Sequence, residues 1–366
     1  MPVSAVDCVQ PAIQHTRQQL FTRFRFGQWS RLALVGILAA ELHVGGCNFG
    51  NFGQFATRSP KDGHEFLAAP FPHIDPARIA QFAGLIAAAV FLAIILFFIF
   101  LYISSVFRFI LFDSVLRREC SIGGGWQRWH RAGRRFFLWQ LVFQIATGLF
   151  FALLIGIPVF IAATAGWFKD FKQHVAGMVG GLILLVGVVL IFALAAAVVQ
   201  VLAKDFLVPV MALENLDFAD GWSRLLGLMR GEPGKYAVYV LLKFVLSIAA
   251  EILFSIIAII PALVVIFPSV VLVVAAKAAG MGWGVATISL AVIFGVIALL
   301  VLIYLVVLVS VPATVFFPAY AMYFFAARYP NLAALLNPAP APPAPESPPA
   351  LETPPPPLLP SSEPIG

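Results

Sequence analysis

The sequence has little charge. Only 11% of its 366 residues are Asp, Glu, Lys or Arg, less than half of the roughly 25% found in soluble domains. Apolar residues make up 61% of the chain, and Phe alone occurs 35 times. This composition excludes an ordinary soluble domain, because too few polar groups remain to cover a water-facing surface. The predicted fold class is an all-α integral membrane protein.

Motifs for catalysis and for cofactors are also missing. Cys8, Cys47 and Cys120 lie far apart and form neither a C-x-x-C pair nor an even disulfide set. His64-Glu65 does not continue as H-E-x-x-H, and no G-x-S-x-G, P-loop or G-x-G-x-x-G segment occurs. We therefore expect no enzyme activity, no metal and no cofactor.

Long hydrophobic runs are abundant. Tyr236–Phe267 carries Lys243 and Glu251 but keeps enough Leu, Ile, Val and Phe to insert into a bilayer. Hydropathy alone does not decide Leu32–Cys47, which is 16 residues long and contains two titratable residues. Four further runs of 18 or more residues without charge predict membrane spans: Ile79–Ile103, Phe136–Gly166, Val175–Ala203 and Trp283–Val311.

An internal repeat favours counting Leu32–Cys47 as a sixth span. The motif Trp-x-Arg occurs at Trp29–Arg31, Trp126–Arg128 and Trp222–Arg224, with the tryptophans 97 and 96 residues apart. Two apolar segments follow each copy, and each unit ends in a short exit marked by aromatic residues or proline. We therefore predict about six transmembrane helices in three tandem two-helix repeats, over about 27–122, 123–218 and 219–330.

Basic residues are distributed unevenly between the predicted loops. Of the 23 Lys and Arg residues, 16 lie in segments that share one side of the membrane and six lie in the loops opposite. Because cytoplasmic loops are enriched in Lys and Arg, both termini are expected in the cytoplasm. The predicted location is the bacterial inner membrane, crossed several times.

The Trp-x-Arg segments are predicted to form amphipathic helices at the membrane surface. In the third copy, Trp222 and Leu225 share one helical face while Arg224 and Arg230 take the other. Basic helices of this kind lie in the headgroup plane and attract anionic lipid. The alternative is that the arginines only set topology and anchor helix ends, and in neither case is nucleic acid an expected partner. The candidate lipid-interface residues are Trp29, Arg31, Trp126, Arg128, Arg131, Arg134, Arg135, Trp222, Arg224 and Arg230.

Polar residues inside the predicted spans are candidates for function. Glu251 lies beyond the midplane of its span, whereas Lys243 is shallow enough to reach the cytoplasmic interface. Gln140, Gln144 and Gln200 on other spans are candidate neighbours of Glu251. Two interpretations stay open, namely a structural hydrogen bond between repeats and the polar site of a transporter.

The C-terminal tail is rich in proline, since 13 of the 27 Pro residues follow Asn337. This composition predicts a disordered tail with polyproline II character, which serves either as a tether or as a ligand for a groove-type protein partner. The expected organisation is a cytoplasmic segment with an amphipathic helix at 1–31, a membrane domain at 32–330 and a cytoplasmic tail at 331–366.

Two stretches of the chain resemble a known group. They are Phe26-Gly27-Gln28-Trp29-Ser30-Arg31-Leu32-Ala33-Leu34, and Phe206-Leu207-Val208-Pro209-Val210-Met211-Ala212-Leu213-Glu214-Asn215 leading into Ala219-Asp220-Gly221-Trp222-Ser223-Arg224. They are similar to the membrane domain found beside some bacterial glycerophosphodiester phosphodiesterases, and to its stand-alone, uncharacterised relatives. The resemblance covers most of Gln28–Tyr329. It implies no phosphodiesterase activity here, because the family's catalytic barrel would need roughly 250 further residues.

The leading hypothesis is a non-catalytic inner-membrane protein that binds anionic lipid or a membrane partner. The alternative is a transporter or lipid-handling protein with a polar intramembrane site around Glu251. A third hypothesis is an assembly scaffold whose tail recruits a cytoplasmic domain.

Overall fold

Helices make up the regular structure of residues 4–22, 24–39, 76–167, 171–278, 280 and 284–336, which the computed structural model describes. An apolar chain in lipid must satisfy its backbone hydrogen bonds within each segment, and helices do so. The predicted all-α class is confirmed for these residues. The helices are α1 Val9–Leu20, α2 Phe26–Leu38, α3 Pro76–Arg117, α4 Ile122–Thr164, α5 Phe171–Leu202, η2 Ala203–Leu207, α6 Val208–Glu214, α7 Phe218–Arg230, α8 Pro233–Ala278, α9 Val285–Ala326 and α10 Pro330–Leu336.

Among the described residues, five stretches of helix are long and apolar enough to cross a membrane. They lie in α3, in α4, in α5 with its continuation through η2 and α6, in α8 and in α9, and each covers all or most of one predicted span. The predicted span Phe136–Gly166 ends two residues beyond α4, and the predicted start of the last span, Trp283, lies outside the described residues. The predicted span Leu32–Cys47 coincides with α2 up to Leu38, and its residues from 40 onward lie outside the described residues. The structure thus shows five candidate spans, and the count of six stays a prediction.

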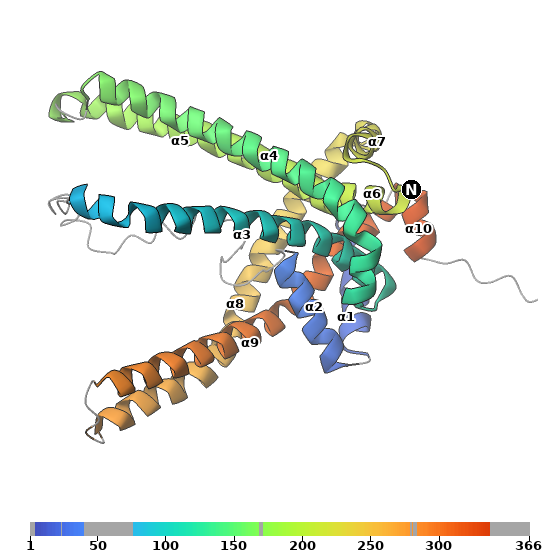
Figure 1. Ribbon diagram of the computed structural model, residues 1–366. Coiled ribbons are helices and arrows are strands. Elements are labelled where there is room, and N and C mark those ends of the chain that lie inside the picture. The colour runs from blue at the N-terminus through green and yellow to red at the C-terminus, as the bar shows by residue number, and fades with distance from the viewer. Residues whose placement is uncertain are drawn as a thin grey trace, which may run out of the picture.

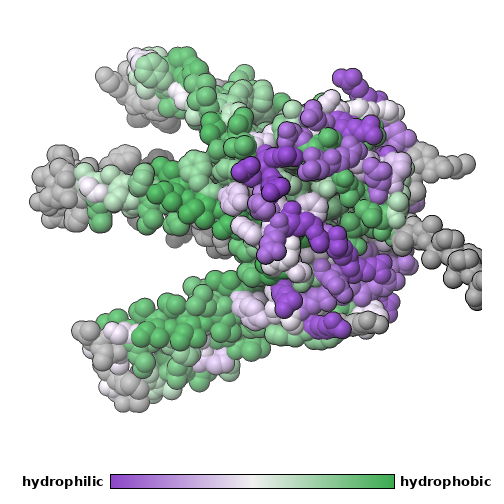
Figure 2. All heavy atoms as spheres, turned by 45° about the vertical axis from the view of Figure 1, so that its right-hand side comes forward, coloured by the Kyte–Doolittle hydropathy of each residue, from purple (hydrophilic) through white to green (hydrophobic). Residues whose placement is uncertain are grey.

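The long helices project from one end of the molecule as three arms, which are the outer parts of α3, of the α4–α5 hairpin and of the α8–α9 hairpin (Figure 1). Their side chains are open to the surroundings, with Leu85, Ile183 and Phe267 each more than two thirds exposed. Figure 2 shows these arms as apolar surfaces with hollows between them. Exposed apolar surface of this extent requires hydrocarbon around it.

The buried core lies at the other end, in a head formed by α1, α2, α6, α7, η2 and the adjoining ends of the long helices (Figure 1). Its largest buried side chains are aromatic, and the rings of Tyr239 and Phe324 stack with centroids 4.5 Å apart. Three buried stretches meet in the head, one from each arm. We call them the exit segments: 104–115 of α3, 203–211 of η2 and α6, and 310–325 of α9.

Prolines shape two of the exit segments. Pro209 has no N–H to donate and its ring crowds the carbonyl of Asp205, so the helix widens at this point into the π turn η2. Pro312 likewise leaves the carbonyl of Leu308 without its helical donor. The Trp29 Nε1–H donates to that oxygen over 2.9 Å, which ties α2 to α9.

Glycines let two Trp-x-Arg helices approach the exit segments closely. A Cβ on Gly133 would lie 2.8 Å from the Cα of Val106, and a Cβ on Gly36 would lie 2.8 Å from Cγ2 of Thr314. Both glycines follow the tryptophan of their motif by seven residues. Any larger residue at either position would push the packed helices apart.

A separate interfacial helix was predicted for each copy of the Trp-x-Arg motif, and the structure differs from this prediction in the second copy. The third copy forms the separate helix α7, because Gly231 and Pro233 end one helix and begin the next. The second copy is part of α4, which continues through Arg135 into the span without a break. No glycine or proline stands between Arg135 and the apolar run, so the helix has no reason to end there.

Candidate functional site

The charged residues of the exit segments come directly after the apolar runs. Arg108 lies five residues beyond Ile103, and Lys204 follows Ala203. At about 1.5 Å per residue, both lie within about 8 Å of the ends of these runs. Where the apolar runs fill the hydrocarbon layer, Arg108 and Lys204 lie close to the level of the lipid headgroups.

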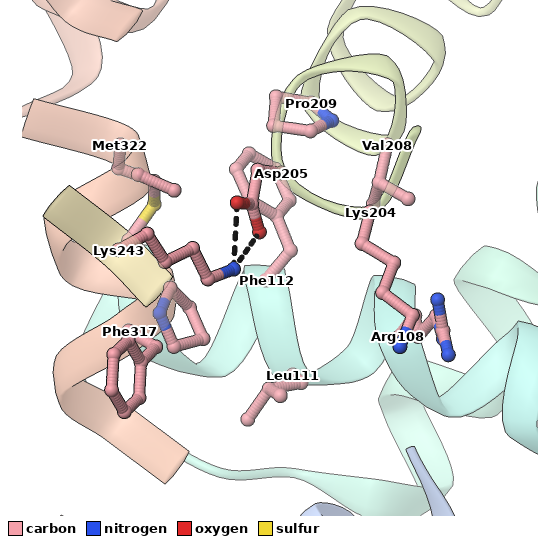
Figure 3. Close-up of a pocket in the computed structure, with 12 residues that line it drawn as sticks. Arg108, Leu111, Phe112, Lys204, Asp205, Val208, Pro209, Lys243, Phe317 and Met322 are labelled. Atoms are coloured by element: carbon pink, nitrogen blue, oxygen red, sulfur yellow. Dashed lines mark hydrogen bonds and ion pairs between the residues drawn. The ribbon is translucent and has the colours of Figure 1, made fainter. Parts of the chain in front are cut away.

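A partly open cavity of about 40 Å³ lies where the exit segments meet (Figure 3). Its charged lining residues are Arg108 from α3, Lys204 and Asp205 from η2, and Lys243 from α8. The rest of its lining is apolar and includes Phe317 from α9. Residues from all three arms therefore line the cavity.

Asp205 and Lys243 form a buried ion pair in this cavity. The Lys243 Nζ lies 2.7 Å from Oδ1 and 2.6 Å from Oδ2 of Asp205, and the side chains are 13% and 8% exposed respectively. The Tyr239 hydroxyl donates a further hydrogen bond of 2.8 Å to Oδ2. Lys243 is therefore held inside the head, which is a different environment from the free interface predicted for it.

Two further cations line the same cavity. Arg108 is 6% exposed, and its guanidinium carbon lies 5.9 Å from the centroid of the Phe136 ring. Lys204 is half-buried, and Figure 3 shows its side chain reaching into the cavity beside that of Arg108. With Lys243 and Asp205 the lining holds three cations and one carboxylate.

Arg108, Lys204 and Asp205 are not among the residues predicted from the sequence. One signal in the sequence marks them: Arg108 and Asp205 are 97 residues apart, the same spacing as Trp29 and Trp126, and each follows an apolar run closely. Their convergence depends on tertiary packing, which no local pattern reports.

The candidate arginines divide into two groups. Three form ion pairs within the head: Arg128 Nη1 lies 3.0 Å from Asp113 Oδ2, Arg224 Nε lies 3.6 Å from Glu214 Oε1, and Arg135 Nε lies 2.8 Å from Asp217 Oδ1. The others are exposed and form no ion pair with the described residues, and these are Arg31, Arg131, Arg134 and Arg230.

The candidate tryptophans face the protein as well as the membrane. Trp126 packs edge-on against Tyr102, and Trp222 stacks on Phe218. Trp29 is held by its hydrogen bond to Leu308. All three are at least partly exposed. Each side chain therefore combines a packed ring with an accessible edge, as in the aromatic belts of membrane proteins.

The candidate polar residues of the spans lie apart. Glu251 is half-buried and forms no hydrogen bond or ion pair with the described residues. Gln140 is buried and accepts a hydrogen bond of 3.2 Å from the Ser105 hydroxyl. Gln144 is exposed and Gln200 is half-buried. No glutamine therefore contributes a hydrogen bond to Glu251 within the described part of the chain.

An apolar groove of about 690 Å³ runs between α1, α8 and α9. Ile13 and Phe21 of the N-terminal region, Leu253 of α8 and Phe316 of α9 contribute to its walls, and Arg17 stands at its edge. Both α8 and α9 contain candidate membrane spans. Among the described residues no group of three or more His, Cys, Asp or Glu side chains is placed to hold a metal.

Comparison with known families assigns the chain to one of them. A family model described as a family of unknown function, DUF7544, matches residues 3–335. The chain belongs to this family. No curated protein and no solved structure matches it. The DUF7544 match carries no link to the glycerophosphodiester phosphodiesterase-associated membrane domain, so that resemblance stays a prediction.

Titratable groups of the DUF7544 head are tied to its packing. His15 on α1 lies 3.0 Å from the carbonyl of Val115 and 3.3 Å from the Tyr323 hydroxyl, and burial lowers the pKa of its imidazole. The Tyr329 hydroxyl donates to Glu214 over 2.6 Å, and burial is the main reason why its pKa rises to about 12. His15 therefore links α1 to the ends of both α3 and α9 in its neutral form.

Proposed function

We propose that this DUF7544 protein is a non-catalytic protein of the bacterial inner membrane that binds anionic phospholipid through its head. Both termini lie in the cytoplasm in this proposal. The observation that carries it is the contrast in charge between head and arms. The described residues within 4–39, 104–135, 204–243 and 326–336 include 16 Lys and Arg but eight Asp and Glu. Figure 2 shows the polar residues gathered over the head and the apolar ones over the arms.

The exposed arginines of α4 are the main contacts in this proposal. Arg131 and Arg134 form no ion pair with the described residues, and both lie within five residues of Phe136, where the apolar run begins. They therefore stand at headgroup level with their charge available. Each such residue contributes about 1 kcal/mol of attraction to an anionic surface.

The proposed architecture is three two-helix units that surround the head, with six spans in total. Two sets of contacts recur in the second and third units and support it. A Cβ on Gly125 would meet Ile110, and a Cβ on Gly221 would meet Leu207. The motif arginines of the second and third units also pair with acids at the preceding exit, as Arg128–Asp113 and Arg224–Glu214.

Quenching of tryptophan fluorescence by brominated lipids tests the proposal. In mixed bilayers, brominated phosphatidylglycerol should quench the head tryptophans more efficiently than brominated phosphatidylcholine. Replacing Arg131 and Arg134 together by Gln should lower this preference, whereas Lys277→Gln, at the outer end of α8, should preserve it. Equal quenching by the two lipids in the unaltered protein would contradict the proposal.

Transport is the competing function, and one observation favours it. Lys243, Ser247, Glu251 and Ser255 recur at every fourth residue of α8 and form a polar stripe that runs from the cavity into the span. Glu251→Gln in proteoliposomes tests it: loss of a pH-dependent flux with the fold intact would establish transport and displace the lipid-binding proposal.

A protein partner of the tail forms a separate part of the proposal. The proline-rich residues after Asn337 are long enough to reach a groove-type domain in the cytoplasm. Pull-downs with the full chain and with a chain ending at Asn337 test this part. Unchanged recovery of partners after truncation would remove it.

A further inference from the structure

We infer that the apolar groove between α1, α8 and α9 is a binding site for one phospholipid, with an acyl chain in the groove and the phosphate group on Arg17. The inference rests on the proposed membrane arrangement and gives lipid binding a defined site, separate from the exposed arginines of α4. The volume of the groove is about 690 Å³, within the range of roughly 300–1,000 Å³ that is usual for small-molecule sites.

The groove is elongated along α8. Its lining residues on this helix recur three and four positions apart, from Leu246 through Ala249, Ala250 and Leu253 to Phe254. They therefore share one helical face over about 12 Å. The two alanines leave a depression between the larger side chains, which is the shape that a hydrocarbon chain fills.

The wall that α1 provides is fixed to α9. The Phe21 ring packs edge-on against Trp29 with centroids 5.5 Å apart, and Trp29 donates its hydrogen bond to the carbonyl of Leu308. Nearer the head, the His15 imidazole lies 3.3 Å from the Tyr323 hydroxyl. Figure 1 shows α1 and α2 at the base of the α8–α9 arm. The groove is therefore formed before any ligand enters it.

The groove extends from the aromatic core toward the arm. Tyr239 of α8 stacks on Tyr320 of α9, with ring centroids 5.1 Å apart. Leu246, the first residue of α8 in the lining, lies seven residues beyond Tyr239, and Pro312 lies eight residues before Tyr320. Both positions are about 10–12 Å along their helices on the arm side of the stacked pair. In the proposed arrangement the groove thus leads from the base of the arm into the hydrocarbon layer.

Arg17 is the one charged residue among the described residues that line the groove. Its side chain is exposed and forms no ion pair with the described residues, and no Asp or Glu occurs in α1. The neighbouring Thr16 hydroxyl donates to the carbonyl of Ala12 over 2.8 Å, so it is already satisfied. A guanidinium without a carboxylate partner can bind two phosphate oxygens through its planar fork.

An apolar groove with a single cation at its edge selects an amphiphile. A lipid without phosphate would fill the groove but leave Arg17 unused, and a free phosphate would use Arg17 alone. An apolar helix of another protein would cover the groove and take Arg17 out of water without a counter-ion, which is unfavourable. A phospholipid satisfies both parts at once, because its phosphate stays at the interface while its chain follows α8 toward the arm.

Native mass spectrometry of the full chain in neutral detergent tests the site. Dioleoylphosphatidylglycerol, dioleoylglycerol and glycerol 3-phosphate are titrated separately, so that the phosphate and the chains are each removed in turn. We expect the first phosphatidylglycerol to bind at least tenfold more tightly than either of the other two. Arg17→Gln should weaken its binding about tenfold, as for the loss of one charge-assisted hydrogen bond, and should leave dioleoylglycerol unaffected.

Arg25→Gln is the matched control for the charge. Arg25 is exposed, forms no ion pair with the described residues, does not line the groove and makes no side-chain cap at the start of α2. Its replacement removes the same charge from the same region and should leave binding unchanged. Equal affinity of Arg17→Gln and Arg25→Gln for phosphatidylglycerol would overturn the inference. Binding of dioleoylglycerol or glycerol 3-phosphate as tight as that of the phospholipid would overturn it too.

A second pair of variants tests the apolar part. Ala250→Phe places a ring in the groove and should weaken phosphatidylglycerol and dioleoylglycerol alike, whereas Ala275→Phe, at an exposed position further along α8, should weaken neither. If Ala250→Phe removes a dimer of the chain and keeps the bound lipid, the groove is an interface between copies and the inference falls. If Ala250→Phe fails to fold, the comparison of Arg17→Gln with Arg25→Gln decides.

The proposed function and this inference fail separately. If the quenching experiment shows no preference for phosphatidylglycerol while Arg17→Gln releases the single tight lipid, the groove site stands and the selectivity of the head for anionic lipid falls. If the Arg131 and Arg134 variant loses that preference while Arg17→Gln keeps the tight lipid, lipid binding by the head stands and the groove site falls.

Discussion

The arms and the head of this protein cover their apolar side chains in opposite ways. In the arms, side chains such as Phe267 remain mostly exposed and depend on lipid. In the head, Phe206 is fully buried and contacts the rings of Tyr236, Tyr239, Phe324 and Phe325. Side-chain packing therefore determines the structure of the head, whereas the arms require only that their side chains be apolar. Substitutions of one kind should have different effects in the two regions.

The largest expected effect comes from Phe206→Ala. Removing a buried ring from the head should reduce the free energy of unfolding by about 3–5 kcal/mol, measured by denaturant titration in mixed micelles. Phe267→Ala on the α8–α9 arm is the matched control, and it should change the free energy little because that ring faces hydrocarbon before and after unfolding. Equal losses for both variants would remove the distinction between head and arms.

Asp205→Asn should have the next largest effect. It leaves Lys243 charged and buried without its carboxylate, which costs about 3–5 kcal/mol in comparable sites. Adding Lys243→Met in the same chain should recover most of this loss, and the comparison of melting temperatures checks it. A double variant no more stable than Asp205→Asn alone would show that the ion pair is not the source of the loss.

Gly133→Val should be destabilising by about 1–3 kcal/mol through overpacking. Its Cβ would press on the backbone of Val106, while a Cβ at Gly156, further along the same helix, meets open space. Gly156→Val is therefore the control with the same chemical change. Melting curves of the two variants should differ clearly, and coincident curves would show that α3 and α4 can separate at little cost.

The smallest expected effect is a pH dependence from His15. Its folded-state pKa lies below the ordinary value because burial disfavours the charged imidazole. The contribution of His15 to stability is thus complete above the unfolded pKa of about 6.5 and is lost as pH falls toward the folded pKa. Melting temperatures at pH 7.5 and 5.5 should differ more for the unaltered protein than for His15→Gln. His130→Gln, at an exposed turn of α4, should keep the full dependence.

The sequence predicts the structure of the arms far better than that of the head. The run Ile79–Ile103 lies inside α3, and Val175–Ala203 lies in α5 and the first residue of η2, because a continuous apolar stretch has one stable form in lipid. The cavity depends instead on Arg108, Lys204 and Lys243 meeting from three helices, and each of them alone reads as a charge at a helix end. The spacing of Asp205 from Arg108 marks its position in the repeat, but the sequence does not identify its partner Lys243, which lies 38 positions away.

In the second copy, local sequence patterns also failed to predict that the Trp-x-Arg helix continues directly into the span. A glycine and a proline separate α7 from α8, so the third copy forms a helix of its own. Arg128–Arg135 shows the same amphipathic pattern, but no glycine and proline follow it directly, so it continues as part of α4. Amphipathicity indicates which face a helix buries, whereas capping residues decide where the helix ends.

The hydrogen bond from Trp29 to the carbonyl of Leu308 joins residues 279 positions apart. During biosynthesis, the N-terminal helices emerge and meet the bilayer long before α9 exists to receive them. The head can therefore close only after the last span has been inserted. A chain stalled before α9 would hold correctly inserted hairpins around an unfinished centre, an incomplete product that quality-control proteases could recognise.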